Sequence, residues 1–167
     1  KEVGNVLLVI GKTEGHIDQS LFARSILDEK KGPPPEVNLF NEKNNGETIL
    51  NLIGKGYVKG AHDISLGGLL VAISKMCIKG DKGIKINKSK NLMNEIEYFF
   101  SEDQGRYLIE INKEDLKEVA KILDKNSVYY EEFGIITKND IIINEKTKLT
   151  IDELKSYYTS WLTKYMS

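Results

Sequence analysis

Residues 58–77 read VKGAHDISLGGLLVAISKMC, and this stretch decides the fold. Its apolar start, its polar and glycine-rich middle and its apolar end predict a short strand, a tight turn and a helix. Within the run from Leu69 to Ile78, only Ser74 and Lys75 are polar. A helix that is apolar on almost every side belongs in a protein core, so we expect little of it to face water.

The turn between this strand and this helix is a candidate anion-binding site. The first backbone N–H groups of a helix have no partner within the helix, and the helix dipole adds partial positive charge there. Gly67 and Gly68 leave their backbone open to a ligand, while Asp63 and Ser65 add a carboxylate and a hydroxyl. The same residues also suit an N-cap and a tight turn without any ligand, and the local chemistry leaves both interpretations open.

The composition is that of an ordinary globular domain. The 167 residues are 40% apolar and 29% charged with a formal net charge of −1, and this length fits one domain. Acidic and basic residues are interspersed, which argues against a nucleic-acid partner, and the longest apolar run is too short to span a membrane. Cys77 is the only cysteine, which excludes an intrachain disulfide and, with two histidines, argues against a metal site. We expect a reduced, cytoplasmic protein.

Apolar periodicity and turn residues predict a mixed β-sheet covered by helices, in the class α/β to α+β. Besides the stretch at 58–77, the expected strands are 5–10, 83–87, 106–111, 127–137 and 140–144. The expected helices are 20–29, 38–53, 114–125 and 152–165. We expect the last two strands to form a hairpin through the turn at Lys138 and Asn139. The final helix carries a stripe of large side chains that predicts core or domain-packing surface: Leu154, Tyr157, Tyr158, Trp161, Leu162 and Tyr165.

Three separated segments resemble a known protein family. They are GKTEGHIDQS at 11–20, AHDISLGGL at 61–69 and FSEDQGR at 100–106, and the proline run at 33–35 is a further point of similarity. Together they resemble the C-terminal domain of the aminoimidazole-ribonucleotide-synthetase-like (AIR-synthase-like) superfamily, and within it the synthetase subunit of phosphoribosylformylglycinamidine synthase. Leu66 departs from the family pattern, which usually has a second aspartate at this position.

The resemblance implies one AIR-synthase-like C-terminal domain over residues 1–167, with an N-terminal ATP-binding domain expected upstream. It implies ATP- and Mg²⁺-dependent amidation of formylglycinamide ribonucleotide in purine biosynthesis, with ammonia from a glutaminase subunit and a small bridging subunit as a further partner. The chain alone is expected to be inactive. Two alternatives stay open. One is another member of the superfamily, such as aminoimidazole ribonucleotide synthetase, selenophosphate synthetase, thiamine-monophosphate kinase or a hydrogenase-maturation protein; the other is a non-catalytic nucleotide-binding module.

The candidate site residues lie in the three segments that carry the resemblance. Asp63, at the end of the predicted strand, is the candidate catalytic residue. Glu102 and Gln104 lie in a turn before a strand, where they could hold a ligand or instead stabilise the turn and pair with Arg106. His16 is expected to be a solvated loop residue. The candidate substrate- and phosphate-binding residues are His62, Ser65, Gly67, Gly68, Gly11, Thr13, Ser20, Glu102 and Gln104.

Overall fold

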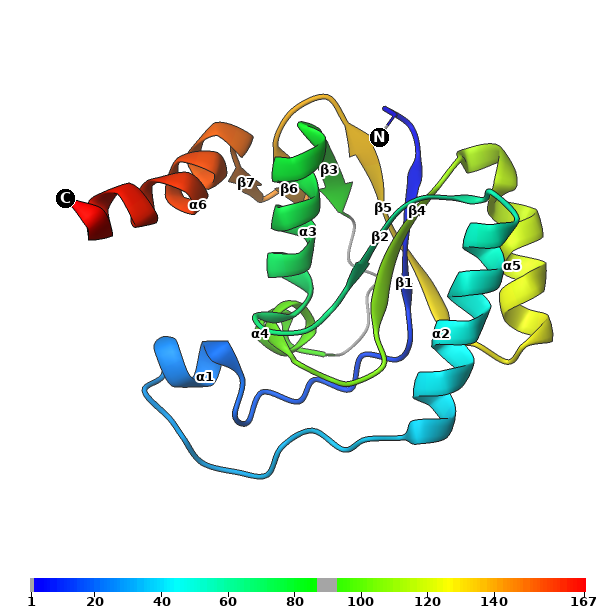
Figure 1. Cartoon of the computed structure of the whole chain (residues 1–167), viewed down its shortest axis with the longest axis horizontal. Helices are drawn as coiled ribbons and strands as arrows, with labels where there is room; N and C mark the ends of the chain where they lie inside the picture. The colour runs from blue at the N-terminus through cyan, green and yellow to red at the C-terminus, as the bar shows by residue number, and fades with distance from the viewer. Residues whose placement is uncertain (1, 87–92) are drawn as a thin grey trace.

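The computed structural model describes residues 2–86 and 93–167. A mixed sheet runs through the molecule with helices against both of its faces (Figure 1). The strands are β1 (Val6–Ile10), β2 (Val58–Asp63), β3 (Gly83–Ile86), β4 (Tyr107–Ile111), β5 (Tyr130–Thr137), β6 (Ile141–Ile143) and β7 (Thr147–Leu149). The helices are α1 (Leu21–Ser25), α2 (Leu39–Gly54), α3 (Gly68–Gly80), α4 (Glu95–Phe100), the 3₁₀ turn η1 (Lys113–Asp115), α5 (Leu116–Lys125) and α6 (Ile151–Met166).

The strands of the sheet follow the order β2-β4-β1-β5-β3-β6-β7. β1 lies inside the sheet and pairs antiparallel with β4 and β5, whereas β3 pairs parallel with β6. Every side chain of β1 is buried, because helices cover both faces of the sheet at this strand. The mixed sheet is therefore confirmed, and so is the doubly buried strand that the apolar run at 5–10 predicts.

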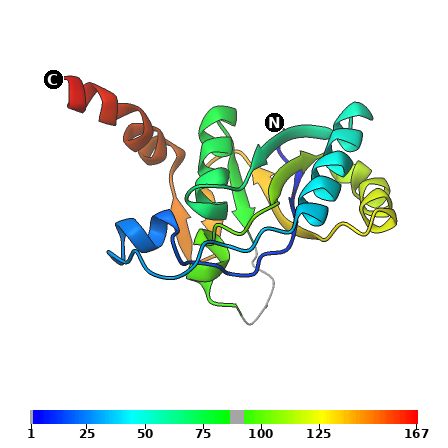
Figure 2. The same cartoon turned by 60° about the horizontal axis from the view of Figure 1, so that its bottom comes forward.

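Two hydrophobic cores lie on opposite faces of the sheet, and the view in Figure 2 separates the helices that cover them. Leu7 and Val9 of β1 belong to the core beneath α3 and α4, and the other residues of β1 belong to the core beneath α2 and α5. The side chains of α3 that are no more than 6% exposed are Leu69, Ala72, Ile73, Met76 and Cys77. The prediction of a buried helix after the glycine-rich turn is therefore confirmed.

The expected hairpin between residues 127–137 and 140–144 is wrong. β5 and β6 do not pair with each other, because β3 lies between them, antiparallel to β5 and parallel to β6. The connection from β5 to β6 passes the start of β3, where backbone atoms of Asn139 and Asp140 occupy the space that a side chain at Gly83 would need. The actual hairpin pairs β6 with β7, a strand that no sequence pattern predicted.

The helices differ from the expectations in two places. α1 ends at Ser25 rather than at residue 29, and Asp28 beyond it has a φ of 54°. α4 forms where no helix was expected and buries Tyr98 and Phe99 in the core. α6 forms as expected, and its aromatic side chains are exposed, which leaves domain-packing surface as the remaining one of the two expected roles. Residue 87 of the expected strand 83–87 lies outside the described residues. None of the described helices is long and apolar enough to cross a membrane.

Alkaline pH is expected to destabilise the core through Tyr98. Burial raises the pKa of its phenol far above the ordinary value of 10.0, and the charge of Glu131 raises this pKa further. The unfolded chain therefore loses the proton near pH 10 while the folded chain keeps it, so the free energy of unfolding falls as pH rises. For one proton the slope is about 1.4 kcal/mol per pH unit. Urea unfolding on both sides of this pH measures the slope; Tyr98→Phe should remove this share of it, and an unchanged slope would contradict the assignment.

Candidate functional site

The three segments singled out in the sequence meet at one edge of the sheet. β1 ends at Ile10, which pairs with Tyr107 at the start of β4, and β2 ends at Asp63, which pairs with the same tyrosine. The loop after β1, the turn after β2 and the turn before β4 therefore emerge side by side at this edge, toward the lower part of Figure 1.

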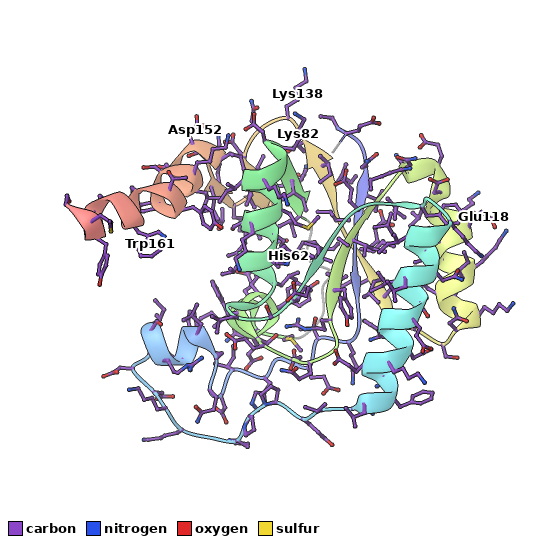
Figure 3. The ribbon with its side chains drawn as sticks, viewed as in Figure 1. His62, Lys82, Glu118, Lys138, Asp152 and Trp161 are labelled. Carbon is purple, nitrogen blue, oxygen red and sulfur yellow. The ribbon has the colours of Figure 1, made fainter. Side chains whose placement is uncertain are left out.

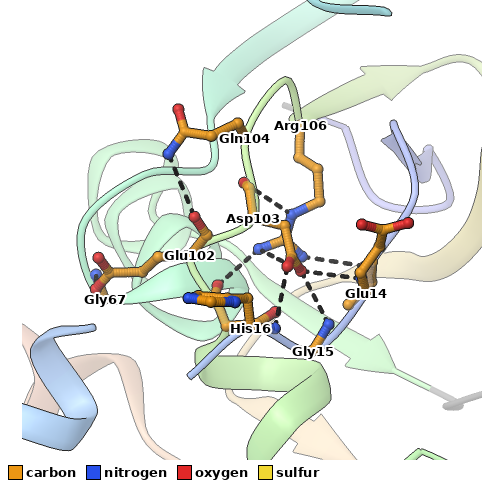
Figure 4. A network of polar contacts seen from close by, with 10 residues as sticks. Glu14, Gly15, His16, Gly67, Glu102, Asp103, Gln104 and Arg106 are labelled. Carbon is orange, nitrogen blue, oxygen red and sulfur yellow. Dashed lines mark hydrogen bonds and ion pairs between the residues drawn. The ribbon is translucent and has the colours of Figure 1, made fainter. Parts of the chain in front are cut away.

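Asp103 holds the loop after β1 in place. Its buried carboxylate accepts hydrogen bonds from the backbone N–H groups of Glu14, Gly15 and His16 at 3.0–3.1 Å (Figure 4). Consecutive amides that converge on one carboxylate form an anion-binding nest, and here the protein fills the nest with its own side chain. The conformation of this loop therefore depends on a residue 87 positions away in the sequence from His16.

The buried guanidinium of Arg106 joins the same loop to the segment before β4. Only 1% of the residue is exposed. Its Nη1 donates to Thr13 Oγ1 at 3.0 Å, and its Nη2 donates to the carbonyl oxygen of Ser101 at 2.6 Å. An ion pair with Asp103 at 3.8 Å balances the charge. Burial lowers the pKa of Arg106, and the negative charge of Asp103 opposes this shift.

Glu102 connects the N-terminal ends of two helices. Its Oε1 accepts a hydrogen bond from the N–H of Leu21 at 2.7 Å and another from the N–H of Gly67 at 2.8 Å. Leu21 is the first residue of α1 and Gly67 is the N-cap of α3, so one carboxylate brings negative charge to the positive ends of both helices. Glu102 thus stabilises the turn, as one interpretation expected, but the residue that pairs with Arg106 is Asp103.

The phosphate site predicted at Gly67 and Gly68 is not formed in this structure. Glu102 takes the N–H of Gly67, and the N–H of Gly68 donates to the carbonyl oxygen of Ser65 at 2.9 Å. Both glycines have positive φ, and a Cβ atom at Gly68 would lie 2.6 Å from the carbonyl oxygen of Ser101. The close approach that requires a glycine at position 68 is therefore to the backbone at the end of α4, not to a ligand.

Three further candidate residues have structural roles. Ser20 is buried and is the N-cap of α1, where its Oγ accepts a hydrogen bond from the N–H of Ala23. Gly11 has a φ of 88°, and a Cβ atom there would lie 2.6 Å from the carbonyl oxygen of Gly105. Thr13 uses its hydroxyl to accept from the Arg106 guanidinium. These residues shape the loop after β1.

Asp63, Ser65 and Gln104 are the candidate residues whose side chains face solvent. Asp63 does not cap α3, because the N-cap is Gly67 and no side chain makes a cap hydrogen bond there. The imidazole of half-buried His62 lies beside it, with Nδ1 at 3.4 Å from Asp63 Oδ1. A solvent-exposed carboxylate that caps no helix, at the meeting point of three loops, suits contact with a ligand, and this role stays a prediction.

A polar cavity of about 610 Å³ opens beside this network. It lies between the loop after β1 and the N-terminal end of α2, and its size is typical of a small-molecule site. Lys12 and His16 bring basic groups to its lining, and Asn38 and Asn41 bring amide groups from the start of α2. The same lining carries four acidic residues, Glu14, Glu36, Glu42 and Asp103, and Lys12 is in an ion pair with Glu14. The cavity therefore offers both donors and acceptors of hydrogen bonds to a polar ligand.

Sequence reasoning identified Gly11 and Gln104 among the residues that line this cavity and missed the rest. His16, expected to be a solvated loop residue, is half-buried in the loop, and one of its ring nitrogens lies 3.0 Å from the carbonyl oxygen of Pro33. Sequence reasoning missed Asn41 because a polar first turn of a helix indicates capping, and only the folded chain brings α2 beside the loop. Within the described part of the chain, no group of three or more His, Cys, Asp or Glu side chains could hold a metal ion.

Comparison with known families assigns this architecture. The sequence model of the family described as AIR synthase related protein, C-terminal domain, matches residues 2–144. The chain belongs to this family. The resemblance of the three segments to the AIR-synthase-like family is therefore confirmed.

Curated relatives of this AIR synthase related domain are longer proteins. The phosphoribosylformylglycinamidine synthase subunit PurL of Pelagibacter ubique is 63% identical over 166 residues, which are 99% of this chain and 23% of that protein. The same subunit of Bartonella henselae is 38% identical over 98% of this chain and 22% of that protein. The chain therefore spans about a quarter of the length of these relatives.

Solved structures share the fold. T. maritima PurL complexed with FGAR matches 92% of this chain and 28% of that chain with a TM-score of 0.73 at 20% identity. E. coli HypE, a hydrogenase maturation protein, matches 90% of this chain and 50% of that chain with a TM-score of 0.63 at 17% identity. At these identities the likeness concerns the fold of the AIR synthase related domain alone.

Proposed function

We propose that this AIR synthase related domain is the C-terminal domain of the synthetase subunit of phosphoribosylformylglycinamidine synthase. The observation that supports it is that the three segments carrying the family resemblance join in one network at a single sheet edge (Figure 4). The relatives at 63% and 38% identity are PurL subunits, which favours this function over the other superfamily members. In the proposed reaction ATP phosphorylates the formyl-amide oxygen of formylglycinamide ribonucleotide, and ammonia then displaces the phosphate to give the amidine.

In this proposal the sheet edge forms one wall of a composite active site. The side-chain amides of Asn38 and Asn41 line the cavity and donate to the oxygens of a phosphate group, and Lys12 and His16 are the basic residues of the same lining. Asp63 presents its carboxylate from the end of β2, on the side where an upstream domain supplies the other wall. Positioning and charge stabilisation of this kind supply most of the catalysis in phosphoryl transfer.

ATP and Mg²⁺ are the cofactors in this proposal, and this domain supplies only part of their site. A Mg²⁺ ion bound together with ATP is held by one or two carboxylates and by phosphate oxygens. Asp63 offers one exposed carboxylate, but the described residues contain no cluster able to hold a metal ion by themselves. We therefore assign most of the nucleotide contacts to N-terminal domains of the same subunit. The other proposed partners are a glutaminase subunit and a small bridging subunit in the cytoplasm.

The test is an amidation assay on the longer polypeptide that contains this chain, with formylglycinamide ribonucleotide, ATP, Mg²⁺ and ammonium. We expect turnover by the longer polypeptide and none by residues 1–167 alone. In the longer polypeptide, Asp63→Asn should lower kcat by about 100-fold or more, as the loss of a group that acts on the transition state does. Its unfolding midpoint should stay unchanged, because Asp63 caps no helix.

Glu114→Gln is the matched control for this substitution. It neutralises an exposed carboxylate in η1, beyond the opposite end of β4, and should leave kcat unchanged. Normal kcat in the Asp63→Asn protein would remove Asp63 from the active site. A longer polypeptide that is folded but without amidation activity would overturn the proposed function.

A further inference from the structure

Helix α6 presents an aromatic face to solvent. Tyr157 is 78% exposed, Trp161 is 62% exposed and Tyr165 is 80% exposed. Figures 1 and 2 show the C-terminal half of α6 extending away from the sheet and the other helices, and Figure 3 shows Trp161 on a side of α6 with no other ribbon segment next to it. An apolar surface of this kind usually marks a contact with another protein surface.

The described contacts that anchor α6 to the domain lie in its first half. Ile151 is 7% exposed, and Lys155 makes an ion pair with Asp81 at the end of α3. The helix has 16 residues, and most of the stability of a helix in a protein comes from the packing of an amphipathic face rather than from helix propensity. We therefore expect another protein surface to pack on the exposed aromatic face of the second half, because the described residues leave it exposed.

A basic hollow continues this aromatic face toward the sheet. A cavity of about 690 Å³ lies between β2, α3 and α6, and its lining includes Lys59, Lys75, Lys79 and Tyr158. Among the described residues, none forms an ion pair with any of these lysines. Lys75 and Lys79 lie one turn apart on α3, so their charges add on one side of the hollow. A cover that fits this surface is apolar opposite α6 and acidic opposite α3.

We propose that the aromatic face of α6 and the basic hollow bind an acidic surface of the remaining part of the same polypeptide. The inference rests on the proposed function, because that function places this chain in a longer subunit. PurL relatives match 98–99% of this chain while this chain spans only 22–23% of their length, so the helix occurs together with much additional chain. A face this rich in exposed tyrosine and tryptophan suits a permanent interface, which a cover on the same polypeptide guarantees.

Docking at this surface fixes the orientation of the candidate active site. α3 begins at Gly68, beside the turn that Glu102 holds, and its second half carries the lysines of the hollow. The helix is a rigid rod whose core-facing side is buried along its whole length. A partner bound to the second half of α3 and to α6 therefore sets where the sheet edge with Asp63 points.

Photo-crosslinking in the longer polypeptide tests this. A benzoylphenylalanine in place of Tyr157 is expected to form an intramolecular cross-link to a peptide upstream of this chain, identified by mass spectrometry. The same substitution at Leu50, which is 67% exposed on α2, is the control and should give no such product. The double substitution Lys75→Glu and Lys79→Glu should lower the yield of the intramolecular cross-link from position 157 several-fold. Lys121→Glu on α5 should leave this yield unchanged.

Each result decides the inference. A cross-link from position 157 to a separate protein chain, or light-induced labelling of no peptide, would overturn it. A second variant, with benzoylphenylalanine in place of Tyr165, should label the same upstream region. It shows whether a missing product is due only to poor geometry at position 157. An active enzyme without the intramolecular product rejects the docking surface alone, whereas an unsubstituted polypeptide without amidation activity rejects the proposed function.

Discussion

Replacing Arg106 with leucine is expected to lower the free energy of unfolding by about 3–5 kcal/mol, the usual cost of removing one partner from a buried ion pair. The change leaves the carboxylate of Asp103 buried without its counter-charge. It also removes the donors to Thr13 and to the carbonyl oxygen of Ser101, so the loop after β1 loses its connection to the segment before β4. Urea unfolding of the chain, followed by circular dichroism, measures the loss.

Lys121→Leu is the control for this prediction, because it also removes a basic residue from an ion pair. The pair of Lys121 with Glu118 lies at the surface of α5, where solvent screens it, so the unfolding midpoint should not move. Equal midpoints for the two variants would show that the Arg106 network does not stabilise the fold.

Gly68→Val should cost about 2–6 kcal/mol, since a strained φ and overpacking each cost about 1–3 kcal/mol. Position 68 has a φ of 71°, and its new Cβ atom would lie 2.6 Å from the carbonyl oxygen of Ser101 and 2.8 Å from the carbonyl carbon of Phe100. Neither obstacle can rotate away, because both are backbone atoms. The unfolding midpoint in urea measures the effect.

Gly54→Val is the matched control, because Gly54 has no positive φ and a Cβ atom there meets no other atom within 4 Å. It should change the midpoint far less than Gly68→Val does. Similar midpoints for the two variants would contradict the close packing of the turn against α4.

The parts of the fold that could be predicted are those in which a local pattern has one consequence. The predominantly apolar runs at 5–10 and 69–78 predict a central strand and a core helix, and both are found. The hairpin prediction failed because strand pairing is not a local property: β3 inserts between β5 and β6 although it precedes both in the chain. α4 was not predicted because its six residues are too few to establish a helical repeat.

The position of the candidate site could be predicted, but the roles within it could not. The three segments do meet, because β1, β2 and β4 end or begin at the same edge. The anion expected at the start of α3 is present as the carboxylate of Glu102, a residue 35 positions from Gly67. The buried pair of Asp103 and Arg106 was not predicted, because charged residues in a turn are usually solvated. Their burial depends on contacts with residues at least 87 positions away in the sequence.

The place of β1 in the sheet has a consequence for the folding of this domain during its synthesis on the ribosome. β1 is wholly apolar, and its strand partners begin only at Tyr107 and Tyr130. At about 5–20 residues per second, roughly 100 residues of further synthesis leave this strand without a partner for about 5–20 s. Pairings so distant in sequence also form slowly after release. We therefore expect the nascent chain to need a chaperone between the synthesis of β1 and that of β4, and to aggregate when translation stalls in this interval.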